Sequence, residues 1–441
     1  MAAITLRNGD QNGDRTRPPW GQPTDRQALV FLATLPLLLL ITGLLIEPPG
    51  AVAAGLCRII TARSLLLSDY LAVGGPGATF VNAGLCGLIA TALLPLARVA
   101  VNGPFIAAVY TVVGFAFFGK NIYSVWPILL GVWLYTRVQG IPFRNSLLVA
   151  LFGTTLAPLV SYFSFAAGLA PVPGLALGWI TGAAAGFLLP PLASHMLRFH
   201  DGYNIYNIGF TGGIIGSFFV AIFRGFALEV TPTTMMDQAV SGWLPGYFAV
   251  GCGGLMLWGL WLSRGGWREL AGGLHRIHGS SGRLVSDFLQ IGNYPASLVN
   301  MGGLGLLSIL FVRAMGGWFN GPVIGGLMTV VGFAAFGKHA RNCLPIFAGV
   351  FLASLVKVWE PSTTAVVIAG LFGTTLAPIA GQYGVPAGVL AGFLHLSIVM
   401  NVGFLHGGVN LYNNGFAGGF VAAFLAPLFN AFKRREPRHA A

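Results

Sequence analysis

Two runs of hydrogen-bonding side chains interrupt a chain whose other long stretches are apolar. Both follow the pattern His-x-Gly-x-Asn-x-Tyr-Asn, at residues 200–207 and again at 406–413. Amide, phenol and imidazole groups can bind a small neutral or singly charged solute through hydrogen bonds. They are costly in lipid without partners, so we expect them to face protein or water, either as a binding site or as a structural polar cluster. The residues are His200, Asn204, Tyr206 and Asn207, then His406, Asn410, Tyr412, Asn413 and Asn414.

A second repeated motif, Gly-Thr-Thr-Leu-Ala-Pro, stands at residues 153–158 and at 373–378. Two hydroxyls just before a proline in an apolar helix allow two interpretations. They could bind a polar solute along a symmetric path, or they could satisfy the carbonyls that the proline leaves without a donor. We include all four threonines among the residues that could line a substrate path. They are Thr154, Thr155, Thr374 and Thr375.

Asn-Gly-Pro occurs at residues 102–104 and 320–322, each time before a short apolar run. Asparagine caps helices and proline suits the first turn, so Asn102 and Asn320 are expected to start two short helices. If these helices begin within the membrane, their free N–H groups would attract an anion or a carbonyl oxygen. The alternative is an ordinary cap at the membrane surface.

The chain carries no motif of a known catalytic or cofactor site. It has no Walker loop, no dinucleotide-binding glycine pattern, no His-Glu-x-x-His and no Gly-x-Ser-x-Gly, and its four cysteines lack metal-ligand spacing. We therefore expect no enzyme activity, no cofactor and no metal. Acidic residues within apolar runs are scarce, which disfavours ion coupling through a carboxylate. Coupling through His200, His406 or backbone carbonyls stays open.

These motifs lie in a chain with the composition of a helical membrane protein. Only 8% of its 441 residues are charged, against roughly 25% in soluble domains. Apolar runs such as residues 30–46 are continuous, which predicts membrane-spanning helices and not a barrel. The net charge of +12 resides in connecting segments and at the ends, so we expect a lipid bilayer and no nucleic acid as partner. The predicted fold class is an all-α integral membrane protein.

The sequence is internally duplicated. "TVVGFAFFGK" at 111–120 returns as "TVVGFAAFGK" at 329–338, and residues 68–85 return with changes at 286–303, both 218 positions later. Further matches keep the same order, so each half is one folding unit preceded by its own apolar helix. The predicted segments are a disordered cytoplasmic tail (1–27), repeat 1 (28–232), a helix opening repeat 2 (233–263), a basic cytoplasmic connector (264–290), the remainder of repeat 2 (291–431) and a basic cytoplasmic tail (432–441).

Basic residues predict the orientation of the halves. Arginines place both termini and the segment 264–290 in the cytoplasm, whereas the first helix puts the matching segment 48–72 outside. This predicts two repeats of inverted topology, with Lys120 and Lys338 at opposite membrane faces. Two parallel repeats of seven crossings are the alternative, and they would leave the basic segment outside. The total is about fourteen crossings, or about ten if short runs such as 103–118 re-enter.

Two ladders of glycines, spaced four apart, lie in matching apolar runs. Small residues at this spacing let helix backbones approach closely, so we predict helix packing; a narrow path lined by backbone is the alternative. The glycines are Gly178, Gly182 and Gly186, then Gly384, Gly388 and Gly392.

The runs "SDYxxxGGxGATFVNAGL", "GFAFFGK" and "GYNIYNIGFTGG" resemble an uncharacterised family of bacterial polytopic membrane proteins, known as a domain of unknown function. The resemblance covers residues 28–430 and implies a membrane fold but no substrate. The inverted duplication with short helices and paired Thr/Pro motifs is also similar in plan to urea transporters. The urea family's Leu-Pro-x-x-Thr-x-Pro signature is not matched, so its substrate is not carried over.

Together these features predict a transport protein of the bacterial inner membrane, with both termini cytoplasmic. We expect a small polar or anionic solute to move between the two inverted repeats by channel-like or facilitative transport. An ion-coupled secondary transporter is the alternative within transport, and a non-transporting scaffold or sensor subunit is the alternative of another class. The sequence leaves open the solute, the direction and whether the chain forms a homo-oligomer.

Overall fold

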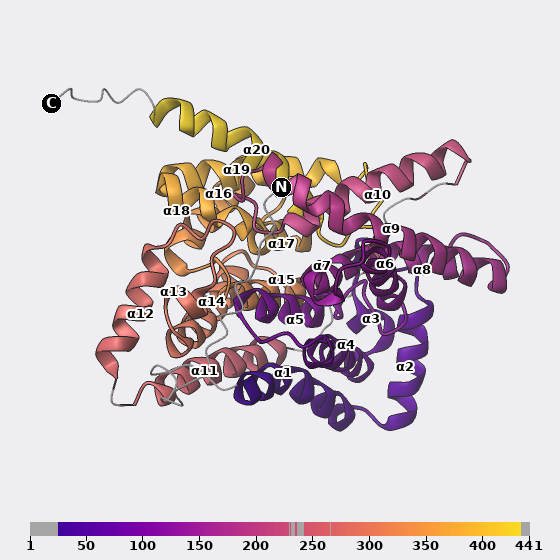
Figure 1. The fold of residues 1–441 in the computed structure, drawn as a ribbon, viewed down its shortest axis with the longest axis horizontal. Coiled ribbons are helices and arrows are strands. Elements are labelled where there is room, and N and C mark those ends of the chain that lie inside the picture. Colours follow the sequence, from indigo (N-terminus) through magenta and orange to yellow (C-terminus); the bar gives the residue numbers. More distant parts are fainter. Residues whose placement is uncertain (1–24, 229, 231–233, 236–241, 265, 434–441) are drawn as a thin grey trace.

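The computed structural model describes residues 25–228, 230, 234–235, 242–264 and 266–433. Regular structure in these ranges is almost entirely helical, which confirms the predicted all-α class (Figure 1). The strands of the described ranges are β1 (Leu67–Ser68) and β2 (Thr234–Met235), which pair in parallel. The helices of the first half are α1 (Asp25–Ile46), α2 (Pro49–Thr61), α3 (Tyr70–Gly74), α4 (Pro76–Leu96), α5 (Gly103–Phe115), α6 (Val125–Val138), η1 (Phe143–Asn145), α7 (Leu147–Gly153), η2 (Thr154–Leu156), α8 (Ala157–Phe165), α9 (Pro171–Phe199) and α10 (Asn207–Gly225).

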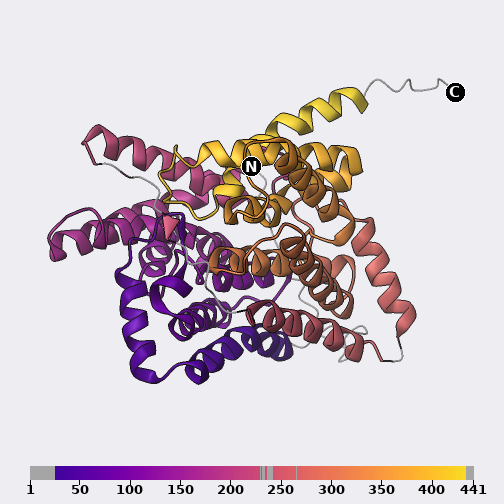
Figure 2. The same cartoon turned by 180° about the vertical axis from the view of Figure 1, so that it is seen from behind.

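The second half repeats this order of α-helices. Its helices are α11 (Leu244–Leu262), α12 (Trp267–Gly279), α13 (Phe288–Ile291), α14 (Tyr294–Ala314), α15 (Gly321–Phe333), α16 (Ala340–Val356), α17 (Thr364–Gly373), η3 (Thr374–Leu376), α18 (Ala377–Tyr383), α19 (Val385–Val402) and α20 (Asn413–Lys433). Each α-helix from α1 to α10 therefore has a counterpart ten places later. In Figure 1 the first half lies mainly to the right and the second mainly to the left, and the view from behind in Figure 2 agrees.

The described residues contain ten helical segments that are long and apolar enough to cross a membrane, five in each half. They indicate a multi-pass membrane protein. The shorter helices differ from them: at 1.5 Å per residue, the 13 residues of α5 cover about 20 Å, less than the ~30 Å of a hydrocarbon core. The ten segments are α1, α4, α7–α8, α9, α10, α11, α14, α17–α18, α19 and α20.

The segment 264–290, predicted to be a connector, is instead part of the folded repeat. It forms α12 and α13, the counterparts of α2 and α3, because Leu270 and Ile277 bury one face of an amphipathic helix. An equivalent arginine then ties each pair together. Arg58 donates to the carbonyls that end α3, and Arg276 donates in the same way to those that end α13. The predicted tails lie largely outside the described residues, although α1 already begins at Asp25.

The short helices α5 and α15 pack against each other at the centre of the molecule (Figure 1). The contact requires glycine, because a Cβ on Gly114 would lie 2.8 Å from the Gly325 carbonyl oxygen and one on Gly332 would lie 3.2 Å from Ala107. Gly114 matches Gly332, and Ala107 matches Gly325, in the duplication. The contact is therefore reciprocal, as in a two-fold symmetric interface.

Five of the six glycines of the two ladders lie in tight contacts, where α9 meets α6 and α8, and where α19 meets α16 and α18. A Cβ on Gly186 would come within 2.3 Å of the Ile128 carbonyl oxygen, and one on Gly392 within 2.4 Å of that of Ile346. Gly384 is different: it precedes α19 with φ +90° and has open space around it, because the second-half helix begins later than its counterpart. The predicted packing role does not apply to Gly384.

Candidate functional site

Each half reaches into the other through its polar cluster. The Thr155 hydroxyl of the first half donates to Asn410 Oδ1 at 2.9 Å and accepts from the backbone N–H of Tyr412 at 3.0 Å. The Asn410 amide in turn donates to the Gly209 carbonyl at 3.0 Å. The opposite exchange is equivalent and joins Thr375 to Asn204 and to the N–H of Tyr206. All four side chains bond to the opposite half, so these contacts hold the halves together.

This exchange brings the rings of Tyr206 and Tyr412 together at the interface, with centroids 4.8 Å apart. Each tyrosine also packs on a phenylalanine from the end of a short helix. Tyr206 meets Phe333 of α15 at 4.8 Å, and Tyr412 meets Phe115 of α5 at 4.5 Å. The sequence predicted these tyrosines as site residues but did not predict their phenylalanine partners.

The prediction that Lys120 and Lys338 lie at opposite membrane faces is wrong, because both side chains are fully buried. Each short helix ends inside the protein, where an asparagine of the preceding long helix binds the turn that follows. Asn82 donates to the Lys120 carbonyl at 3.0 Å, and Asn300 donates to that of Lys338 at 2.8 Å. The lysines therefore stay in the interior and do not mark a membrane face.

The ammonium of Lys338 is well satisfied. It donates to the hydroxyls of Thr374, at 2.6 Å, and of Tyr206. It also lies over the Tyr206 ring, 4.5 Å from the centroid, and 5.3 Å from that of Phe333. Such contacts replace part of the hydration that a buried cation loses.

Lys120 differs from its counterpart. Its ammonium is 5.2 Å from the Phe115 centroid but has no hydrogen-bond partner within the described part of the chain. The hydroxyls that correspond to the partners of Lys338 do not accept from the Lys120 ammonium. Thr154 donates to the Leu151 carbonyl at 2.6 Å, and its counterpart Thr374 makes the equivalent bond to Leu371. Tyr412 donates to Thr111 at 3.3 Å. The two halves therefore share the same residues here but not the same hydrogen bonds.

Successive ring and cation contacts connect the two lysines in one continuous series, which we call the central row. The row has the same residue types read from either end, because its first and last, second and fifth, and third and fourth residues are counterparts in the duplication. The central row is Lys120, Phe115, Tyr412, Tyr206, Phe333 and Lys338.

Neither lysine of the central row forms an ion pair within the ranges that the structure describes. Among the described residues one ion pair is formed, between Arg283 and Asp201 near the surface. The buried Asp69 and the largely buried Asp287 instead bind the starts of the short helices of the opposite half. Two lysines thus face each other through aromatic rings, a setting that favours a negatively charged ligand over a cation.

The starts of α5 and α15 are occupied by protein groups. Asn102 and Asn320 cap the helices as predicted, each accepting from the N–H three residues on, at 3.1 Å. Asp287 accepts from the Gly103 N–H at 3.2 Å, and Asp69 accepts from its counterpart Gly321 at 3.0 Å. The solute-binding role predicted for these N–H groups is therefore taken by carboxylates of the other half.

The predicted histidines support loops. His200 bonds to Asn207 at 3.0 Å, and His406 bonds to Asn413 at 2.9 Å. Each asparagine then donates to a carbonyl of the preceding long helix. His395, which lacks a counterpart in the first half, bonds to Asn414 at 3.0 Å. These contacts favour the structural interpretation of the histidines.

A cavity of about 430 Å³ opens between the halves next to the central row. Its wall is mainly apolar and includes Leu66 and Phe118 of the first half with Phe372 and Asn413 of the second. The Phe118 ring lies 5.1 Å from that of Phe115, which is the ring beneath Lys120. A series of contacts therefore leads from the cavity wall through two phenylalanine rings to Lys120, whose ammonium has no hydrogen-bond partner among the described residues.

The profile of the family described as protein of unknown function, DUF1576, matches residues 49–225 and 267–431. The chain belongs to the DUF1576 family. The two DUF1576 segments begin at the counterpart helices α2 and α12 and contain the whole central row. No curated protein and no solved structure matches the chain.

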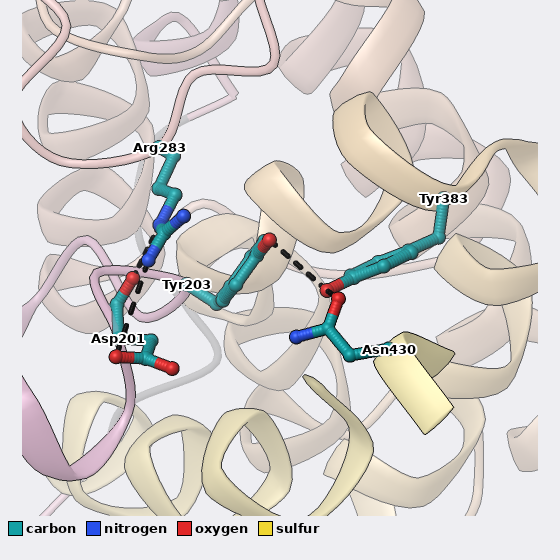
Figure 3. A network of polar contacts seen from close by, with 5 residues as sticks. All are labelled: Asp201, Tyr203, Arg283, Tyr383 and Asn430. Atoms are coloured by element: carbon teal, nitrogen blue, oxygen red, sulfur yellow. Dashed lines mark hydrogen bonds and ion pairs between the residues drawn. The ribbon is translucent and has the colours of Figure 1, made fainter. Parts of the chain in front are cut away.

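A network of side chains joins the halves of this DUF1576 protein at a second place in their interface (Figure 3). The duplication relates the residues of this network to positions at the end of the interface where the cavity lies. Arg283 donates to the Asp201 carbonyl at 2.5 Å and lies over the Tyr203 ring at 4.6 Å. The Tyr383 hydroxyl lies 3.0 Å from that of Tyr203 and 2.9 Å from Asn430 Oδ1. At the cavity end the corresponding positions carry residues of other types, including Leu65, Phe163 and Val409 of one apolar cluster. The two ends of the interface are therefore chemically different.

Proposed function

We propose that this protein moves a small polar or anionic solute across the membrane between two halves of inverted topology, by channel-like or facilitative transport. The observation that carries the proposal is the buried central row, to which each half contributes three residues. A scaffold would gain little from two buried lysines, because each is costly to keep in a low-dielectric interior. In a solute site, the contacts that the lysines make with a bound ligand offset that cost.

Inverted topology is supported by the number of long apolar segments. Five candidate spans in each half form an odd number, so the second half starts from the opposite side of the membrane. The reciprocal contacts of α5 with α15 add a two-fold relation, as between inverted repeats whose axis lies in the membrane plane. The resemblance in plan to urea transporters agrees with this arrangement.

The route we propose begins at the cavity, passes the rings of Phe118 and Phe115 and reaches the central row. From there it continues towards the network of Arg283 and Tyr383, which ties the halves together at the other end. One accessible end and one closed end are expected of a transporter that opens to one side at a time. We place the protein in the bacterial inner membrane with both termini in the cytoplasm.

Flux measurements in proteoliposomes test the proposal. We expect purified protein to release or take up small anions down their own gradient, without an imposed sodium or proton gradient. A strict need for either gradient would replace the facilitative mechanism by the ion-coupled one. No flux of any small anion or polar solute, from protein that is folded and correctly inserted, would favour a scaffold or sensor subunit.

A further inference from the structure

We infer that Lys120 binds the charged group of a small organic anion that carries one carboxylate, while the adjoining cavity holds its apolar part. The inference rests on the proposed function for the route by which the anion arrives. The binding site itself is argued from the contacts of Lys120, the cavity wall and the comparison with Lys338.

The duplication supplies an internal reference for Lys120. In the second half the same lysine is held by two hydroxyls, those of Thr374 and Tyr206. In the first half Thr154 and Tyr412 are present at the matching positions, yet neither accepts from the Lys120 ammonium. Three ammonium donors at Lys120 thus lack a hydrogen-bond acceptor in the described residues. A carboxylate can accept from such a group and also neutralise its charge.

The second lysine determines the charge of the ligand. Lys338 raises the positive potential at the other end of the central row, so a metal or ammonium ion is disfavoured there. Two of its three donors already bond to protein. One vacant ammonium matches one negative charge, and a second carboxylate on the ligand would lie in the apolar cavity without a partner.

The cavity determines the body of the ligand. A volume of about 430 Å³ lies within the range of small-molecule sites, which are mostly apolar with few polar groups. The amides of Asn413 and Asn414 reach the wall, but His406 and His395 already engage their oxygens. The remaining wall includes one further amide, Asn401, and apolar side chains such as Leu66, Ile368 and Met400. An apolar tail is therefore favoured over a sugar or an amino acid.

The barrier between the two parts of the site is aromatic. Phe118 lines the cavity, and its ring packs on Phe115 beneath the Lys120 ammonium. In the inferred complex the Phe118 side chain moves so that the cavity joins the space next to the ammonium. Gly119 lies between Phe118 and Lys120 in the chain, and its φ of +76° allows the tight turn there.

Equilibrium binding to the purified full chain tests this inference without requiring transport. The probes are radiolabelled monocarboxylates from acetate to hexanoate and benzoate, each compared with its primary amide and with chloride and succinate as competitors. We expect at least one monocarboxylate to bind, its amide to fail, and longer tails to bind better than acetate. In Lys120→Met the affinity should fall by about tenfold or more, as expected for loss of a charged hydrogen bond, and Lys120→Arg should recover part of it.

Lys357→Met is the matched control, because this lysine at the end of α16 bonds to Phe393 and Ser397 of α19 and not to the central row, so binding should stay unchanged. Binding that is equal in Lys120→Met, equal for the amides, or absent for every monocarboxylate would overturn the inference. So would chloride or succinate competing as well as the best monocarboxylate. Binding that depends on Lys120 without flux in vesicles would retain this site and refute the transport function. Flux that is unchanged in Lys120→Met would retain the transport function and refute this site.

Discussion

The ammonium of Lys338 and the phenol hydroxyl of Tyr206, 132 residues apart and in different halves, are joined by a hydrogen bond in the buried interface. The same pair of residue types, Lys120 and Tyr412, occurs in the exchanged position. There the tyrosine bonds to Thr111 instead. One interface therefore presents two states of the same contact, which makes the two lysines a natural pair for mutational comparison.

Lys338→Met and Lys120→Met should affect stability differently. Removing the Lys338 ammonium leaves two buried hydroxyls with one acceptor bond fewer, which costs about 1–3 kcal/mol. Removing that of Lys120 takes away a buried charge without breaking a hydrogen bond among the described residues, so stability should stay constant or rise. Thermal unfolding of both variants in the same detergent measures the difference. Equal loss in both variants would contradict the asymmetry of the interface.

Thr375→Val should weaken the attachment of the halves. Its hydroxyl bonds to Asn204 and accepts from the Tyr206 N–H, so valine leaves two buried partners unsatisfied at a cost of about 1–3 kcal/mol. Thr154→Val is the control, because its hydroxyl bonds only within its own helical turn among the described residues. We expect a lower melting temperature for Thr375→Val. For Thr154→Val we expect folded yield to stay intact and flux to fall, and unchanged flux would remove Thr154 from the path.

Cysteine labelling tests the inverted topology. Ala53 in α2 and Ala271 in α12 are exposed counterparts of the same residue type, so a cysteine at each probes matching positions. With Cys57 replaced by serine, a membrane-impermeant maleimide should label the two variants from opposite sides of oriented vesicles. Labelling from the same side would show parallel repeats and would end the proposed route.

Arg283→Ala should loosen the end of the interface shown in Figure 3. The arginine and Asp201 side chains are 44% and 60% exposed, so their pairing contributes only about 1 kcal/mol or less. We expect flux to rise by about two- to fivefold, because the closed end opens more often. Arg198→Ala, at an exposed arginine near the end of α9, serves as the control. An unchanged flux in Arg283→Ala, or the same rise in the control, would show that this network does not control the opening of this end.

Local features of the fold could be predicted from the sequence because their causes lie close together in the chain. Asn102 and Asn320 cap the helices that follow them. The burial of Lys120 could not be predicted in this way. An apolar run that ends on a lysine is typical of a helix that reaches the membrane surface. Here the turn is held inside by tertiary contacts such as that with Asn82, 38 residues away.

By itself the sequence determined a helical membrane protein with two copies of one folding unit, since hydropathy and duplication are properties read along the chain. Only the tertiary structure decided which copy supplies each partner. Thr155 could bond to Asn204 of its own half or to Asn410 of the other, and the duplicated sequence favours neither. Packing of α5 against α15 brings the polar loop of each half within reach of the threonines of the other half, so the contacts are exchanged. Both lysines are then buried in the same interior, at the two ends of the central row.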